Sequence, residues 1–124
     1  MHRITVYPVT EEGRAEYGLD PGENTTGLFA FDQFIGDPER WNQGLGTRAV
    51  SLLVTYLFQK KAARKIVIDP RARNPRAIRC YEKCGFHKVK LLPKKELHEG
   101  KMEDCWLMVT EAGGDEKETE NLTR

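Results

Sequence analysis

A glycine turn is the feature of this chain whose residue types and spacing most clearly suggest chemistry. It lies within the stretch Trp41 to Arg48, W-N-Q-G-L-G-T-R, between an apolar segment and a strongly apolar helical one. Because Gly44 and Gly46 carry no Cβ, the backbone can bend tightly there and direct several N–H groups at one anion, and a helix behind the turn adds partial positive charge. A phosphate-binding turn is one interpretation and an ordinary strand-to-helix turn is the other, since neither a P-loop nor a dinucleotide fingerprint is complete.

Two aspartates occupy positions where a charged side chain is unusual. Asp32 interrupts the apolar segment 27–35, and a carboxylate there must be paired, exposed or kept for chemistry, because burying an unpaired charge is costly. Asp69 ends the β-branched segment 65–68, where a carboxylate suits an open site. A helix cap is the alternative role for Asp69.

The elements that must position these residues are predicted from hydrophobic periodicity and from breaker residues. Strands are expected at 4–7, 27–35, 65–68, 86–92 and 104–110. Helices are expected at 45–61 and at 74–86, the second beginning near Pro75 and stopping at Gly85. Segment 10–26 is expected to be a loop, 37–43 a polar connector and 93–101 a charged excursion.

The first predicted helix has an apolar stripe wide enough to press against a sheet. The residues expected on its buried face are Leu45, Ala49, Leu52, Leu53, Tyr56 and Leu57, widened by Val50, Val54 and Phe58.

Length and composition indicate a single globular domain. The 124 residues allow one modest core, and we predict one domain over 1–110 and a disordered tail over 111–124. No apolar run approaches the roughly 20 residues that span a bilayer and the start lacks a signal pattern, so no membrane partner and a cytoplasmic location are expected. The spacing of Cys80, Cys84 and Cys105 argues against a disulfide framework and against a metal site.

The net charge of +1 hides an uneven distribution. Residues 40–101 carry sixteen basic and four acidic side chains, whereas both flanks are acidic. A basic middle that contains the glycine turn suits a polyanionic ligand and acidic flanks suit a cationic one, with solvated surface as the alternative. Nucleic acid is not an expected partner, because the basic segment lacks interleaved aromatic residues.

The second helix carries a spacing that resembles a known superfamily. N-x-x-A-x-x-x-Y-x-x-x-G-F, from Asn74 to Phe86, follows a strand–G-x-G–helix unit and resembles the GNAT superfamily of N-acetyltransferases. More narrowly, F-D-Q-F-I-G, G-L-G-T, D-P-x-x-x-N and R-A-I-R-C-Y-E-K-C-G-F are similar to the aminoglycoside 6'-N-acetyltransferases, over residues 20–109. The resemblance implies an α/β (α+β) fold with a mixed, mostly antiparallel sheet whose central parallel strands splay, and two helices after the two motifs. It also implies acetyl-CoA (CoA) as the cofactor.

The resemblance further implies direct acetyl transfer to a primary amine of a cationic, aminoglycoside-like small molecule. Asp32 would be the catalytic base and Tyr81 the acid that protonates the departing thiolate. A core aromatic packed against Ile78 is the alternative role for Tyr81. Substrate contacts are implied for Asp32, Gln33 and Asp69, and no metal is implied.

The implied cofactor contacts are mostly made by the backbone. The pyrophosphate would lie on the amides of the glycine turn, and the pantetheine arm would pair with the end of the preceding strand. Trp41 departs from the Arg or Gln that the superfamily prefers three positions before the first glycine. The implied cofactor-binding residues are Phe34, Ile35, Gln43, Gly44, Leu45, Gly46, Thr47, Asn74 and Arg76.

Members of the superfamily have a strand, one or two helices and a further strand before the strand predicted at 4–7. The sequence begins after the equivalent of that part, which usually helps to form the acceptor site. Either the sequence is a fragment or a natural truncation, or another chain supplies this wall. An exposed edge at the first predicted strand would favour aggregation or dimerisation, which makes a homodimer a possible partner arrangement. The alternatives are a non-catalytic CoA-binding or oligomerising remnant, and an acyltransferase of siderophore-type hydroxamate precursors.

Overall fold

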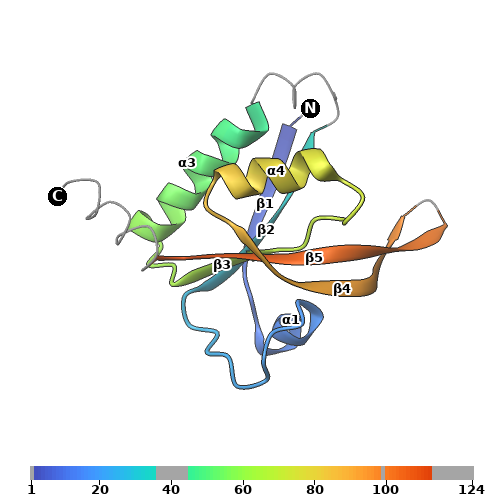
Figure 1. Ribbon diagram of the computed structural model, residues 1–124. Helices are drawn as coiled ribbons and strands as arrows, with labels where there is room; N and C mark the ends of the chain where they lie inside the picture. The colour runs from blue at the N-terminus through green and yellow to red at the C-terminus, as the bar shows by residue number, and fades with distance from the viewer. Residues whose placement is uncertain (1, 36–44, 99, 113–124) are drawn as a thin grey trace.

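A mixed five-stranded sheet organises the computed structural model, which describes residues 2–35, 45–98 and 100–112 (Figure 1). The strand order is β1-β2-β3-β5-β4. β2 and β3 are parallel, and the other neighbouring strands are antiparallel. The predicted mixed, mostly antiparallel sheet is therefore confirmed, with these bounds: β1 His2–Pro8, β2 Leu28–Ile35, β3 Lys65–Ile68, β4 His87–His98 and β5 Lys101–Glu111.

The two parallel strands stay together for only a short distance. Their ladder comprises three pairs, the last of which is Ala30 with Val67. β2 then continues to Ile35 alongside β1, whereas β3 ends at Ile68. Figure 1 shows β1 and β2 crossing steeply over the direction of β3, β5 and β4. The expected splay of the central parallel strands is thus present.

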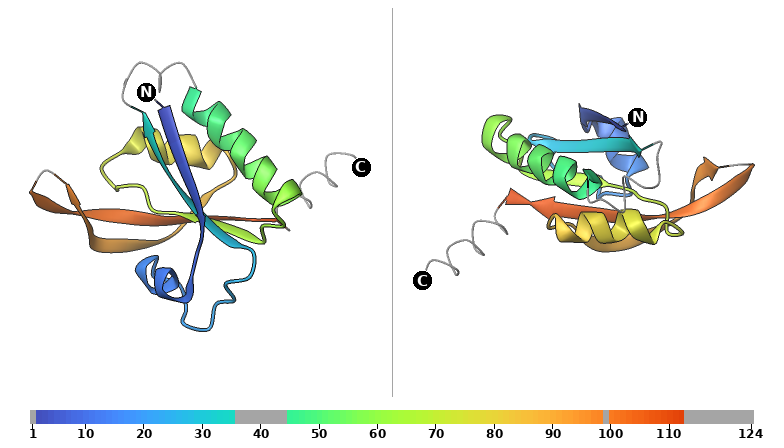
Figure 2. Two further views of the ribbon diagram at one scale, coloured as in Figure 1. Left: turned by 180° about the vertical axis from the view of Figure 1, so that it is seen from behind. Right: turned by 90° about the horizontal axis from the view of Figure 1, so that it is seen from above.

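Helices cover both faces of this sheet (Figures 1 and 2). α3 (Leu45–Lys60) and α4 (Pro75–Lys83) pack on one face, and α1 (Glu11–Glu16) lies on the other. The pleat of β2 directs Phe31 into the core under α3 and α4, and Ala30 into the core on the α1 side. None of the helices in the described part of the chain is long and apolar enough to cross a membrane.

The buried face of α3 differs from the predicted one. Val50, Val54 and Leu57 are buried, whereas Leu52 is 74% exposed and Tyr56 is 48% exposed. The predicted stripe covered most of the helix circumference, but a helix lying on a sheet buries only one side. Contact with the sheet therefore buries the residues at spacing i, i+4 and i+7 that begins at Val50, namely Val50, Val54 and Leu57.

α1 corrects the prediction that segment 10–26 is a loop. Thr10 caps the helix, its hydroxyl accepting a hydrogen bond from the Gly13 amide at 3.1 Å, and two glutamates occupy the first turn. Gly13, a weak helix former, concealed this signal. After the helix, Gly18 has φ +69°, and a Cβ there would lie 2.7 Å from Leu92 Cδ2. Glycine therefore allows the turn to close against β4.

β4 and β5 correct the prediction of a charged excursion at 93–101. Both strands extend through this segment as a long hairpin. Their register shifts between Leu92 and Glu96, so Pro93 falls at an irregularity where a missing N–H is tolerated. β5 runs to Glu111, the first residue of the predicted tail. Residues 113–124 lie outside the described ones, so disorder there stays a prediction.

The signals predicted for the second helix hold. Asn74 is its N-cap, the side-chain oxygen accepting a hydrogen bond from the Ala77 amide at 3.2 Å, and Pro75 is the first helical residue. Gly85 follows the Cys84 cap with φ +96°, a conformation that ends helices.

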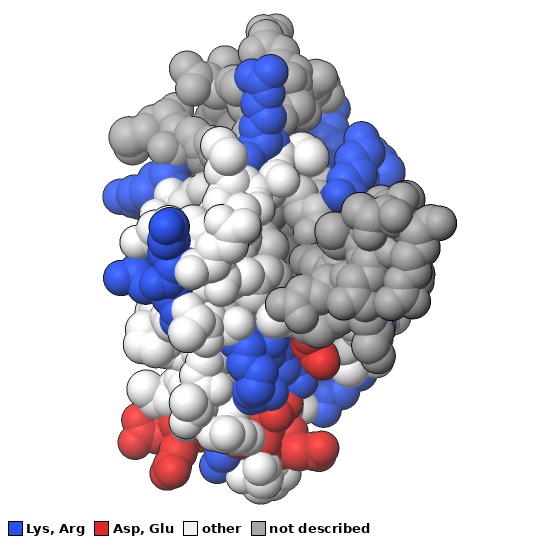
Figure 3. All heavy atoms as spheres, turned by 90° about the vertical axis from the view of Figure 1, so that its left-hand side faces the viewer, with Lys and Arg blue, Asp and Glu red and all other residues white. Residues whose placement is uncertain are grey.

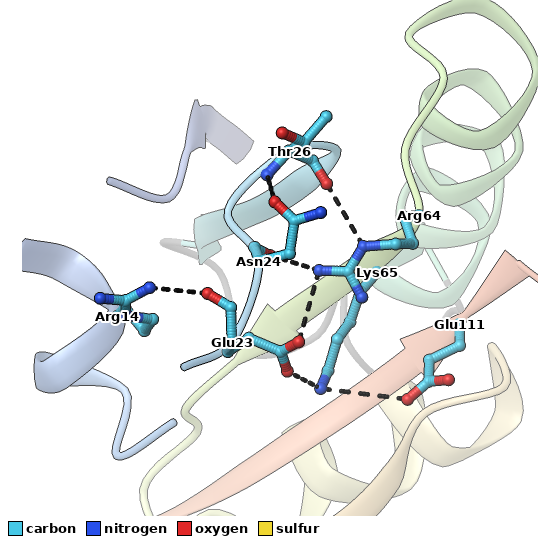
Figure 4. A network of polar contacts seen from close by, with 7 residues as sticks. All are labelled: Arg14, Glu23, Asn24, Thr26, Arg64, Lys65 and Glu111. Atoms are coloured by element: carbon cyan, nitrogen blue, oxygen red, sulfur yellow. Dashed lines mark hydrogen bonds and ion pairs between the residues drawn. The ribbon is translucent and has the colours of Figure 1, made fainter. Parts of the chain in front are cut away.

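A polar network ties segment 20–27 to β3 (Figure 4). The Glu23 carboxylate accepts from Lys65 Nζ at 2.6 Å and from Arg64 Nη2 at 3.5 Å. Arg14 of α1 donates to the Glu23 carbonyl oxygen at 2.7 Å. The hydrogen bond from Lys65 is the main reason that the pKa of Glu23 is lowered. The network therefore joins α1 to the sheet through Glu23, whose carbonyl oxygen contacts α1 and whose carboxylate contacts Arg64 and Lys65.

Replacing Glu23 by Gln should lower the free energy of unfolding by about 1 kcal/mol near neutral pH, because Lys65 and Arg64 lose their anion. A carboxyl whose pKa is lowered on folding stabilises the fold above its unfolded pKa, and that contribution disappears as the pH falls through the folded pKa. The difference between variant and parent should therefore shrink in acid, which urea unfolding at about pH 7 and about pH 3 would measure. Glu111→Gln is the control, since Glu111 is 59% exposed and 4.0 Å from the same lysine. Equal losses of unfolding free energy in Glu23→Gln and Glu111→Gln would contradict the assignment of Glu23 as the main anionic partner of Lys65.

Candidate active site

A cavity of about 870 Å³ lies where β2 and β3 separate. Its walls come from β1, α1, the second half of β2, the end of β3, the inner face of α4 and Lys95 of β4. Five residues predicted for the site line it together: Asp32, Gln33, Asp69, Asn74 and Tyr81. The fold thus gathers the proposed acid, base and substrate contacts around one space, although they are up to 49 positions apart in the sequence.

Asp32 lies in the part of β2 beyond the parallel ladder. Its partner across the ladder with β1 is Thr5. Alternation along the strand places Asp32 on the face of Ala30, toward α1, and Gln33 on the face of Phe31. The residue is exposed and lines the cavity, so its carboxylate is not buried in the core.

Tyr81 is at once a core residue and a residue of the cavity wall. It is 7% exposed and packs edge-to-face with Phe31, at 6.1 Å between centroids, and with Phe86, at 5.9 Å. Ile78 belongs to the same core cluster, as the alternative interpretation expected. The Tyr81 hydroxyl accepts a hydrogen bond from Gln33 Nε2 at 2.9 Å, so its own proton is available for donation.

Burial is the main reason that the pKa of Tyr81 is raised. The hydrogen bond from Gln33 opposes this shift, and the negative charges of Asp32 and Asp69 add to it. The side chain is therefore a protonated phenol at neutral pH.

Asp69 follows β3 and is paired with a residue that the sequence analysis did not select. Lys95 Nζ lies 3.0 Å from Asp69 Oδ2, and both side chains are about one-fifth exposed, at 23% and 19%. Burial alone would lower the pKa of Lys95, but the hydrogen bond and charge of Asp69 outweigh it and the net shift is upward. The cap of the following helix is Asn74, so the capping alternative for Asp69 does not apply.

The α1 side of the cavity is built by residues that sequence reasoning missed. The hydroxyls of Tyr7 and Tyr17 are hydrogen-bonded to each other, and burial is the largest cause of the raised pKa of each. Glu12 and Glu16 of α1 complete this wall. A threonine followed by two glutamates is a helix-start signal that could have revealed α1. Lys95 lies in a charged run and carried no such signal.

The predicted cofactor residues are less completely described. Gly46 is buried and Thr47 is half-buried in the first turn of α3, where the Thr47 carbonyl oxygen accepts from Cys84 Sγ of α4 at 3.4 Å. Arg76 is exposed in the first turn of α4. These three residues are outside the cavity lining, whereas Asn74 belongs to it.

The other cofactor predictions are located only in part. Phe34 and Ile35 stand opposite Arg3 and His2 in the ladder, at the end of β2. Leu45 begins α3 as predicted. Gln43 and Gly44 lie outside the described residues, so the anion-binding role of the turn remains a prediction. No cluster of three or more His, Cys, Asp or Glu that could hold a metal occurs in the described ranges.

Comparisons with known proteins identify the family of this chain. Residues 4–93 match the family model described as an acetyltransferase (GNAT) domain. The aminoglycoside N(6')-acetyltransferase type 1 of Klebsiella pneumoniae is 42% identical over 66 residues, which cover 53% of this chain and 33% of that protein. The kanamycin resistance protein of Rhizobium radiobacter is also 42% identical over 66 residues, covering 53% of this chain and 61% of that protein.

The fold has matching solved structures. AAC(6')-Ib in complex with ribostamycin and coenzyme A superposes with a TM-score of 0.68 at 28% identity, covering 93% of this chain and 59% of that chain. The chain therefore spans less than two thirds of the length of each of these relatives. Because the family model matches most of the sequence, the chain belongs to the GNAT acetyltransferase family.

Proposed function

We propose that this protein transfers the acetyl group of acetyl-CoA to a primary amine of a cationic small molecule of the aminoglycoside type. The observation that carries the proposal is the gathering of Asp32, Asp69 and Tyr81 around one cavity in a GNAT-family chain. A relative that is 42% identical over 66 residues is an aminoglycoside N(6')-acetyltransferase by name, and the AAC(6')-Ib complex holds coenzyme A with ribostamycin.

Asp32 is proposed as the general base. An acceptor amine is largely protonated at neutral pH and must lose a proton before its lone pair can attack a carbonyl carbon. Asp32 is exposed to the cavity, so it can attract the ammonium group and accept this proton, directly or through a water molecule. Acetyl-CoA supplies the thioester, whose C–S bond is exchanged for the C–N bond of the product.

Tyr81 is proposed as the group that stabilises the departing thiolate. Its hydroxyl accepts from Gln33 and keeps its own proton for a second hydrogen bond. The raised pKa of Tyr81 retains that proton at neutral pH but also makes the phenol a weaker acid. We therefore assign Tyr81 mainly as a hydrogen-bond donor to the sulfur, with proton delivery completing the step.

The cofactor would be held by backbone groups at two places. The first turn of α3, with Gly46 and Thr47, has amide donors that are not used within the helix and that suit a pyrophosphate. The end of β2 beyond Ala30 diverges from β3, which leaves a direction in which an extended pantetheine arm could add like a strand. Arg76, exposed in the first turn of α4, suits the 3'-phosphate.

The deciding experiment mixes the protein with acetyl-CoA and a panel of primary amines, including kanamycin and spermidine, and follows the release of free thiol. Thiol release that depends on the amine supports the proposed function. Binding of acetyl-CoA without amine-dependent thiol release would support the non-catalytic alternative instead.

Asp32→Asn should leave acetyl-CoA affinity unchanged and lower the amine-dependent rate by about 10², the usual size of general-base assistance. The residual rate should rise toward high pH, because more of the free amine is then already neutral. Steady-state rates between about pH 6 and pH 9 test this. Asp20→Asn is the matched control, since Asp20 is exposed and outside the cavity lining. A near-normal rate for Asp32→Asn at neutral pH would exclude the residue as the base.

Gly46→Asp should weaken acetyl-CoA binding by at least about tenfold, because it places a Cβ and a negative charge in the first turn of α3. Calorimetric titration would measure the affinity, and thermal melts would show that the variant is folded. Gly22→Asp introduces the same charge where an added Cβ meets nothing within 4 Å, and it should bind like the parent. Parent-like affinity in folded Gly46→Asp would remove this turn from the cofactor site.

Tyr81→Phe keeps the aromatic ring and removes only the hydroxyl. Stability should fall by about 1 to 3 kcal/mol, because Gln33 loses an acceptor beside the core. The single-turnover rate should fall by about 10² if the hydroxyl assists thiolate departure. The control is Tyr56→Phe, at a tyrosine 48% exposed on α3. A stability loss with a normal rate would leave Tyr81 a purely structural role.

A further inference from the structure

The ammonium group of Lys95 occupies a complete cation site inside the cavity. Its Nζ atom lies 3.0 Å from Asp69 Oδ2 and 5.4 Å from the centre of the Tyr17 ring. A carboxylate combined with an aromatic face is the pair of groups that recognises an ammonium ion. The charge of Glu16 adds to the attraction. These are the groups that a second amine of a polycationic acceptor would need.

The surroundings of Lys95 hold it at this place. Tyr17 is 5% exposed and its hydroxyl is hydrogen-bonded to Tyr7, so the ring cannot turn freely away from the ammonium group. Both Lys95 and Asp69 line the cavity and are mostly shielded from solvent. A salt bridge in such a setting is screened less than one on an open surface.

The backbone of β4 directs Lys95 toward the cavity. The register of β4 against β5 shifts between Leu92 and Glu96, and such irregularities redirect side chains. Lys94 has φ +49°, and its amide donates to Asp104 Oδ1 at 2.9 Å. Lys94 is exposed and outside the cavity lining, whereas its neighbour Lys95 belongs to the lining. The two adjacent lysines are therefore a natural pair of test and control.

We propose that Lys95 is an internal ammonium group that fills the Asp69 subsite of the acceptor cavity and so selects against acceptors whose second ammonium group would have to lie at Asp69. The inference rests on the proposed acetyltransferase function and narrows its substrate class. Within the proposed class of cationic acceptors, the preferred one presents its reactive amine toward Asp32 and places a neutral group, not a second ammonium, beside Lys95 and Asp69. A polyamine must displace Lys95 from Asp69, or leave its own second ammonium without a partner, before it binds fully.

The test measures binding, so it does not depend on turnover. Two probes are titrated calorimetrically into the protein saturated with CoA: kanamycin, which carries several amines, and 6-amino-6-deoxyglucose, which carries one. Lys95→Met keeps the aliphatic stem and removes the ammonium group. It should tighten kanamycin binding by about tenfold and change binding of the monoamine by less than about twofold. Lys94→Met removes the same charge outside the cavity and should change neither.

Lys95→Gln is a second variant for the case that Lys95→Met does not fold. Its side-chain amide is neutral but can still donate a hydrogen bond to Asp69. It should tighten kanamycin binding by less than Lys95→Met does. The inference is overturned if the parent and the folded Lys95 variants all bind the amines but the variants bind kanamycin no more tightly than the parent does. The proposed function would then still stand. If no chain binds either amine while CoA still binds, the acceptor site itself is wrong and the inference falls with it.

Discussion

The parallel ladder between β2 and β3 ends after three pairs, and the cavity depends on that early end. On the helix side of the point of separation, Phe31, Tyr81 and Phe86 form a mutual edge-to-face cluster with centroids about 6 Å apart. Such large rings bury much apolar surface and attract one another in edge-to-face geometry, so the diverging strands still enclose a packed core. On the opposite face the same divergence exposes Asp32 and brings the end of β3, with Asp69, to the cavity.

Residues 2–27 add β1 and α1 as walls of the cavity on this face of the sheet. α1 is only six residues long, too short to be stable alone, and its position is set by contacts with the rest of the chain. Tyr17 packs in the second core cluster and its hydroxyl meets that of Tyr7 on β1. Glu23 joins the following segment to Lys65 at the start of β3. This wall of the cavity is therefore stabilised by one buried ring, one hydroxyl pair and one ion-pair network.

Local signals and resemblance predicted much of the site, and long-range packing decided the rest. Asn74 and Gly85 mark the ends of α4 through their own hydrogen bonds and backbone angles, so a sequence can show them. Asp32 and Tyr81 were selected by motif, and the structure places both at one cavity. Lys95 could not be found in this way, because its role depends on a register shift between β4 and β5 and on a ring from α1. Contact with the sheet likewise determines which face of α3 is buried, and the helix periodicity alone did not show it.

The cavity combines two electrostatic requirements that oppose each other. After burial, the negative charges of Asp32 and Asp69 are among the causes that raise the pKa values of Tyr7, Tyr17 and Tyr81, so the cavity favours protonated and cationic groups. The same field that attracts an ammonium group also holds its proton more tightly, which slows formation of the neutral amine. Lys95 offsets part of this field at Asp69, so an amine near Asp32 meets a smaller barrier to deprotonation than it would beside two uncompensated carboxylates. In the proposed reaction, the ion pair between Lys95 and Asp69 would therefore weaken the binding of polycationic acceptors and also ease loss of the proton from the reacting amine.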